Sequence, residues 1–189
     1  ITKQMDVVLH ATKSLIEGYK KLHPTKKHIW FPPAVDDEYF KNYNMKKIEN
    51  MVFVGNIINR GQIIKDLNKE VGMKYYVMKT GKDMLDMIST SKIHFNKTMS
   101  PHGVNYRSLE TIALGTVLLT DYKKELEEMG FIDGKNCLMY RNYEECLKKY
   151  KNILKDKEKY NSILQNGLEL AKNHSFTVRV KNLINEITN

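Results

Sequence analysis

The residues best suited to chemistry lie in one stretch, 96–110, which reads NKTMSPHGVNYRSLE. Polar, glycine-containing sequence leads there from an expected strand into an expected helix. Free backbone N–H groups at such a junction attract anions, and here they belong to Gly103, Val104 and Asn105.

Arg107 and Glu110 follow with a spacing of three residues, so both face the same side of the first helical turns. A guanidinium near phosphate and a carboxylate one turn deeper would suit a nucleotide, with Glu110 accepting hydrogen bonds from ribose hydroxyls. The alternative is a surface ion pair, which is worth roughly a few tenths of a kcal/mol.

Two further loops are candidates for binding a phosphate or a base. In the first, GNIINRG at 55–61, Gly55 allows close backbone approach, Asn56 follows it, and Arg60 offers a forked donor to a diphosphate. This loop is neither a Walker loop nor G-x-G-x-x-G, and a strand-to-helix turn needs a glycine anyway. The second loop contains Lys79 and Thr80, where a base could stack or bond to the backbone.

The elements that must position these loops alternate between strand and helix. Short loops between them predict an α/β fold, a Rossmann-like doubly wound parallel sheet with helices on both faces. The expected strands are 50–54, 74–78, 93–96, 116–120 and 136–140, and the expected helices are 60–70, a segment after Asp83, 104–114 and 123–129.

The flanks of this alternation differ from it. A helical stretch at 12–22 and a β-rich run at 29–31 precede Pro32-Pro33, and the polar tract 36–47 is typical of a linker. Three apolar stripes at helical spacing, within 143–154, 160–168 and 176–187, predict C-terminal helices that pack on the core.

Composition restricts the class of partner without choosing one. The 189 residues are 41% hydrophobic and 28% charged, with net charge +9, which favours nucleotide phosphates, nucleic acid or a charged membrane. A solvated basic surface is the alternative. We expect no membrane span, no signal peptide, two reduced cysteines (Cys137 and Cys146) and a cytoplasmic protein, and we interpret Ile1 as the start of a fragment.

Several of these motifs resemble a known family. The run from Val104 to Glu110, continued by Ala113-x-Gly115 and by LLTD at 118–121, resembles the nucleotide-sugar-binding motif of spore-maturation-type glycosyltransferases, which are GT-B enzymes related to glycosyl transferase group 1. GKN at 134–136, HSF at 174–176 and the opening WFPPAVDDEYF at 30–40 are similar to that family as well.

The resemblance implies two Rossmann-like domains facing a cleft, with this chain as mainly the C-terminal, donor-binding one. Residues 1–45 would be a remnant of the N-terminal domain and the crossover linker, 46–174 the nucleotide-sugar-binding domain, and 175–189 a C-terminal helix. The resemblance implies a nucleotide-diphosphate sugar as the donor, with a UDP-sugar as one candidate, and the acceptor and the catalytic residues stay unknown.

Site roles follow from the same resemblance. Glu110 matches the ribose-binding carboxylate, Asn105 and Arg107 match residues at the diphosphate and sugar, and Gly55 and Arg60 match the first phosphate loop. His102 departs from the pattern, because Glu-x7-Glu relatives carry an acid that contacts the donor sugar at that position.

Charge on the departing diphosphate can be neutralised by fixed cations and a helix N-terminus, so we expect no metal and no cofactor. Because the acceptor base normally comes from the N-terminal domain, we expect the chain to bind donor without turnover. Two alternatives remain open: a non-catalytic basic module that binds nucleic acid, and a glycosyltransferase that acts on modified DNA. The first lacks any recognisable nucleic-acid-binding motif.

Overall fold

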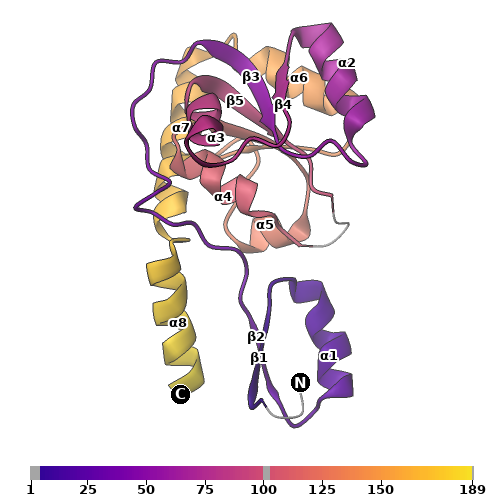
Figure 1. Cartoon of the computed structure of the whole chain (residues 1–189), viewed down its shortest axis with the longest axis vertical. Coiled ribbons are helices and arrows are strands. Elements are labelled where there is room, and N and C mark those ends of the chain that lie inside the picture. Colours follow the sequence, from indigo (N-terminus) through magenta and orange to yellow (C-terminus); the bar gives the residue numbers. More distant parts are fainter. Residues whose placement is uncertain (1–4, 100–102, 189) are drawn as a thin grey trace.

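The computed structural model describes residues 5–99 and 103–188. It has two parts stacked along its long axis (Figure 1). The smaller part, which we call the small module, is a β–α–β unit with a parallel pair of strands. It consists of β1 (Val7–His10), the 3-10 turn η2 (Lys13–Leu15), α1 (Ile16–Leu22) and β2 (Lys27–Trp30).

The larger part is built on a five-stranded sheet with strand order β4-β3-β5-β6-β7, all parallel. The predicted doubly wound α/β fold is therefore confirmed. Its strands are β3 (Glu49–Val54), β4 (Lys74–Tyr76), β5 (Ser91–Asn96), β6 (Val117–Asp121) and β7 (Leu138–Tyr140). From β3 the chain adds β4 on one side and then β5, β6 and β7 on the other, so the strand order reverses between β3 and β5. In a doubly wound sheet, such a reversal creates a crevice at the carboxyl ends of the two strands.

Helices cover both faces of this sheet because its strands alternate their apolar side chains. In β3, Met51 and Phe53 pack in one cluster, with side chains of α2, α6 and α7, whereas Val52 and Val54 pack with α3 on the other face. The helices are α2 (Gly61–Val71), α3 (Gly81–Ser89), α4 (Tyr106–Ala113), α5 (Lys124–Glu128), α6 (Tyr143–Ile153) and α7 (Lys157–Lys172).

The linker 36–47 lies along the surface of the large part and is fixed at its end by Lys47. Its ammonium donates to the carbonyls of Ser89 at 2.7 Å and Gly115 at 2.7 Å, and to Thr116 Oγ1 at 3.0 Å. These carbonyls belong to the C-terminal ends of α3 and α4, so one cation supports both helices. Burial lowers the pKa of Lys47 to about 8.

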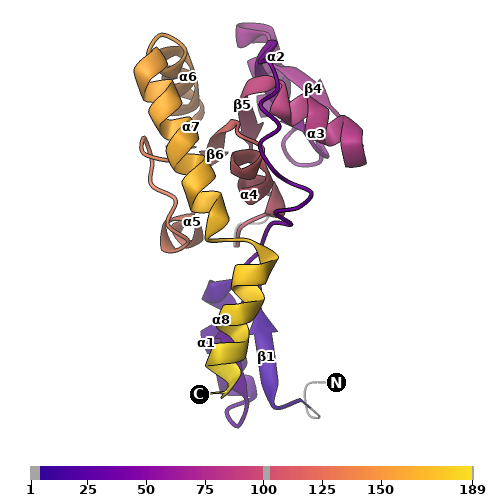
Figure 2. The ribbon, with the colours of Figure 1, turned by 90° about the vertical axis from the view of Figure 1, so that its left-hand side faces the viewer.

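The last helix, α8 (Phe176–Thr188), returns to the small module (Figure 2). It begins where Val35 and Ser175 form a parallel bridge. Arg179 donates to His174 Nδ1 at 2.8 Å, and His174 Nε2 lies 2.7 Å from the carbonyl of Met129. At the far end, Lys27 donates to the carbonyl of Glu186. The predicted C-terminal helix is thereby confirmed and placed.

One strand boundary differs from the expectation, and the cysteines and helices can be compared with it as well. The edge strand β4 ends at Tyr76 rather than residue 78, because Met78 adopts a left-handed φ of 57° that breaks the extended backbone. Cys137 and Cys146 are buried free thiols, as expected, and burial raises the pKa of each to about 12. Within the described ranges, none of the helices is long and apolar enough to cross a bilayer.

Candidate functional site

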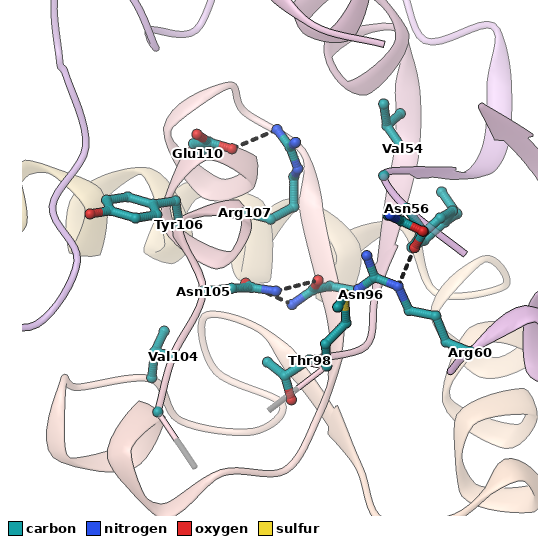
Figure 3. Close-up of a pocket in the computed structure, with 14 residues that line it drawn as sticks. Val54, Asn56, Arg60, Asn96, Thr98, Val104, Asn105, Tyr106, Arg107 and Glu110 are labelled. Carbon is teal, nitrogen blue, oxygen red and sulfur yellow. Dashed lines mark hydrogen bonds and ion pairs between the residues drawn. The ribbon is translucent and has the colours of Figure 1, made fainter. Parts of the chain in front are cut away.

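A cavity of about 560 Å³ opens at the carboxyl ends of β3 and β5, beside the start of α4 (Figure 3). This is the crevice that the strand order creates. We call it the first pocket. It is lined by Phe53, Val54, Gly55, Asn56, Arg60, Asn96, Thr98, Met99, Gly103, Val104, Asn105, Tyr106, Arg107 and Glu110.

The start of α4 is held in place by its N-cap. Asn105 has extended backbone, and its side-chain oxygen accepts from the N–H of Ser108 at 3.3 Å. Gly103, two residues earlier, has a φ of +79° and lies so close to Thr12 that a Cβ would come within 2.7 Å of its Oγ1. Gly103 and Asn105 therefore fix the path by which the backbone enters the helix. The residues that begin α4 line the pocket, and the first N–H groups of a helix have no intrahelical partner.

Beneath this helix start lies a buried amide network. Asn96 Nδ2 lies 3.2 Å from Asn105 Oδ1 and 3.1 Å from Thr120 Oγ1, and Asn105 Nδ2 donates back to Asn96 Oδ1 at 3.0 Å. The backbone carbonyl of Asn96 also accepts from Tyr140 at 3.2 Å. Strands β5, β6 and β7 thus jointly orient the N-cap of α4, which fixes the floor of the pocket.

The side wall is supported by a carboxylate at the end of β6. Asp121 accepts from both the N–H of Thr98, at 2.8 Å, and its hydroxyl, at 2.6 Å. Its Oδ2 also lies 3.5 Å from Lys123 Nζ. Because Thr98 lines the pocket, Asp121 positions that wall from outside.

Arg60 supplies the first cation of the site. Its guanidinium lies 4.9 Å from the centre of the Phe53 ring and donates to the carbonyls of Asn56 and Lys97. Burial, and then the positive charge of Arg107, lowers its pKa from the usual arginine value, and Arg60 stays protonated. Two guanidiniums in one pocket make a field that attracts anions.

Arg107 and Glu110 form an ion pair of 2.6 Å inside the pocket, drawn as a dashed line in Figure 3. Their side chains are only 22% and 16% exposed, so the pair is not the surface contact that the sequence left open. Burial lowers the pKa of Arg107 and raises that of Glu110, and each partner's charge opposes the shift of the other.

His94, on β5, lies fully buried near both arginines. Its Nδ1 is 2.8 Å from Thr111 Oγ1, which donates to the carbonyl of Arg107 at 2.6 Å. Since that hydroxyl has one proton, Nδ1 of His94 is the donor. Burial and the two guanidiniums lower the pKa of His94 well below its usual value, so the ring is neutral and supports the first turn of α4.

Comparison of the sequence with known families shows which family the chain belongs to. The profile of a family described as glycosyl transferase-like matches residues 58–185. The chain belongs to this family. No curated protein matches the sequence.

Solved structures place the glycosyl transferase-like chain in the GT-B fold. HepE from Anabaena, solved with UDP and glucose, has 10% identity and a TM-score of 0.75 over 97% of this chain and 63% of its own. The pneumococcal O-GlcNAc transferase GtfA, solved with UDP and GlcNAc, has 9% identity and a TM-score of 0.70 over 99% of this chain and 46% of its own.

A third similar structure is the sucrose-phosphate synthase of Thermosynechococcus elongatus, with 12% identity and a TM-score of 0.71 over 98% of this chain and 59% of its own. The chain spans 46% to 63% of the length of these three proteins. At such low identity, the likeness establishes the fold of the glycosyl transferase-like chain.

Most of the residues singled out in the sequence meet in the first pocket. Those that line it are Gly55, Asn56, Arg60, Gly103, Val104, Asn105, Arg107 and Glu110. Lys79 and Thr80 follow the neighbouring strand β4 and are not among its lining residues. His102 lies outside the described residues.

Sequence reasoning did not select Asn96, Thr98 or Tyr106, which also line the pocket. Asn96 could have been found, because a polar residue that ends an apolar strand at the predicted crevice is unusual. Thr98 carries no such signal, since its role depends on Asp121, which lies 23 positions further along the chain.

Proposed function

We propose that this chain is the donor-binding part of a glycosyltransferase that transfers a sugar from a nucleotide-diphosphate sugar, a UDP-sugar in our proposal, to a hydroxyl acceptor. The observation that carries the proposal is the convergence of Arg60, Arg107, Glu110 and the α4 N-terminus in one crevice. The relatives HepE and GtfA were solved with UDP, which supports the choice of nucleotide.

The diphosphate would lie against the free N–H groups that precede α4, between the two guanidiniums. Anion binding at a helix N-terminus needs main-chain donors and a favourable dipole, and arginine adds forked, charged hydrogen bonds. The same groups would stabilise the charge that develops on the diphosphate as the glycosidic bond breaks. In this proposal transfer therefore requires no metal.

Glu110 would bind the ribose hydroxyls once Arg107 turns to phosphate. In the chain without donor the two side chains neutralise each other at 2.6 Å. A nucleoside alone would have to break this pair without compensation, whereas a diphosphate gives Arg107 a new anionic partner. We therefore expect uridine to bind far more weakly than UDP.

Lys79 and Thr80 would approach the base from the end of β4. An N-terminal domain of the same enzyme would face the first pocket and supply the acceptor base. The chain's share of its relatives' length supports this part of the proposal, and so do four exposed apolar side chains on α8, which such a domain would cover. They are Phe176, Val180, Ile184 and Ile187, exposed by 43% to 55%.

Calorimetric titration with UDP, UDP-glucose and UDP-N-acetylglucosamine tests the proposal. We expect saturable binding, weakened about tenfold or more in both Arg107→Ala and Glu110→Ala, because each change removes a charged hydrogen bond. Arg141→Ala is the matched control, since Arg141 stacks on Tyr122 at 4.1 Å and does not line the pocket. Absence of heat with UDP and with both sugars would contradict the proposal.

A further inference from the structure

A second cavity, of about 280 Å³, lies between the large part and the small module. We call it the second pocket. Figure 1 shows α5, which forms one side of it, on the end of the large part that faces α1. It is lined by Lys13, Ser14, Gly103, Lys123, Lys124, Glu125 and Glu128.

The second pocket adjoins the first. Gly103 lines both, and Asp121, which holds the wall residue Thr98, also lies 3.5 Å from Lys123 on the other side. The two cavities are therefore neighbours along the carboxyl edge of the sheet. A ligand in the second pocket would lie next to the loop that enters α4.

Glu125 makes the second pocket more than a gap between two parts. The residue is only 8% exposed, and its Oε1 accepts from the N–H of Ser14 at 3.1 Å. Its other oxygen, Oε2, is buried, and no described residue donates a hydrogen bond to it. A buried carboxylate oxygen without a donor is costly, so the site favours a ligand that brings an O–H or N–H group.

The remaining lining groups carry both signs. Lys13 pairs with Glu128 at 3.0 Å, and Lys123 and Lys124 also line the cavity, so its lining includes both ammonium donors and carboxylate acceptors. Sugar hydroxyls both donate and accept hydrogen bonds and carry no charge. Such a lining suits them better than it suits a purely anionic or an apolar ligand.

We propose that the second pocket is an acceptor subsite, in which Glu125 Oε2 accepts a hydrogen bond from a hydroxyl of a sugar unit of the acceptor. This inference rests on the proposed function, because it needs a donor in the first pocket. It assigns Glu125 a binding role, positioned by the small module through Ser14.

The test uses the ¹⁵N-labelled chain saturated with UDP and titrated with methyl β-D-glucopyranoside, methyl β-D-galactopyranoside and methyl N-acetyl-β-D-glucosaminide. We expect at least one glycoside to shift the amide resonances of Ser14, Gly103 and Glu125 in a saturable manner. Glu125→Gln, which replaces the accepting oxygen by an amide donor, weakens this binding about tenfold. UDP affinity stays unchanged.

Glu127→Gln is the matched control, because Glu127 lies on the same helix, accepts a hydrogen bond from the Tyr122 hydroxyl at 2.8 Å and does not line the pocket. Thermal unfolding of both variants shows whether either loses the fold. UDP binding without any glycoside effect on these amides overturns the acceptor subsite alone, as does an unchanged effect in a folded Glu125→Gln. Failure of UDP to bind the first pocket overturns the donor proposal and the acceptor assignment with it.

Discussion

Two strand-to-helix junctions at the carboxyl edge of the sheet, one on each side of β3, are built very differently. At the junction of β5 and α4, the N-cap Asn105 is bonded to its helix and joined to the buried Asn96. At the junction of β4 and α3, the N-cap Thr80 makes no side-chain cap bond. Its neighbour Lys79 forms an exposed ion pair with Asp83 at 3.4 Å.

The two junctions differ in the buried hydrogen bonds that support the start of the helix. A buried polar network rigidifies only when all its members are satisfied, and the network under α4 spans three strands. A helix start held in this way keeps its N–H groups aimed at one point, as anion binding requires. The β4–α3 junction has the same topology without that support, so sheet position alone does not make a site.

The largest expected effect comes from removing the network itself. Asn96→Leu leaves the hydrogen-bonding groups of Asn105 and Thr120 without their buried partner, which should cost about 3 kcal/mol of unfolding free energy. Thr80→Val at the other junction should cost less than about 0.5 kcal/mol, because no cap bond is lost. Urea unfolding of both variants measures the contrast, and equal losses would refute it.

The glycines at the two junctions offer a finer contrast. Gly103 and Gly81 both have positive φ, +79° and +58°, but a Cβ on Gly103 meets Thr12 Oγ1 at 2.7 Å, whereas one on Gly81 meets Tyr39 at 3.9 Å. Gly81→Ala should cost about 1 kcal/mol from backbone strain alone, and Gly103→Ala about 2 kcal/mol from strain plus overlap.

The double variant Gly103→Ala, Thr12→Ala isolates the overlap, because it removes the hydroxyl and keeps the strain. We expect thermal or urea unfolding to show about half of the Gly103→Ala loss restored. Thr12→Ala combined with Gly81→Ala should restore nothing. Equal behaviour of the two pairs would mean that the small module does not press on the α4 loop.

Substitution of Lys47 tests the hydrogen bonds by which one side chain joins the ends of α3 and α4. Lys47→Met removes three hydrogen bonds at the C-terminal ends of α3 and α4. Burial lowers the pKa of Lys47 to about 8 from 10.5, so the folded chain holds this proton less tightly than the unfolded chain does. Stability from this group therefore rises with pH between these two values.

The advantage of the wild-type chain over Lys47→Met should accordingly grow by about 2–3 kcal/mol between pH 7 and pH 10. Denaturant unfolding at the two pH values measures it. Lys46→Met, at the adjacent exposed lysine, is the matched control and should show no such change. A constant difference would mean that Lys47 is solvated in the folded chain.

The sequence was sufficient to predict the sheet, because alternating apolar runs and short glycine turns are local signals. It also identified the loops at Gly55 and Gly103 as parts of one site, since parallel strands bring their carboxyl ends together. The spacing of three residues allowed Arg107 and Glu110 to pair, but it could not predict that the pair is buried inside the pocket. Nor could the sequence predict that Thr12 lies against Gly103. Burial of the pair and the contact with Thr12 both depend on packing between elements that no local pattern encodes.

The smallest expected effect concerns Lys79 and Thr80, which were predicted from the sequence as site residues but do not line the first pocket. Because Lys79 is 42% exposed in its pair with Asp83, Lys79→Ala should change the free energy of unfolding by less than about 0.5 kcal/mol.

The same residues also distinguish the two junctions in binding. If the β4–α3 junction contributes only backbone contacts to a base, Lys79→Ala and Thr80→Ala should weaken UDP binding by less than about threefold, which is under about 0.7 kcal/mol. Arg60→Ala, at the start of α2, should weaken UDP binding about tenfold or more. Titration of UDP into the three variants compares the junctions directly, and a loss in Lys79→Ala as large as that in Arg60→Ala would move the phosphate site toward β4.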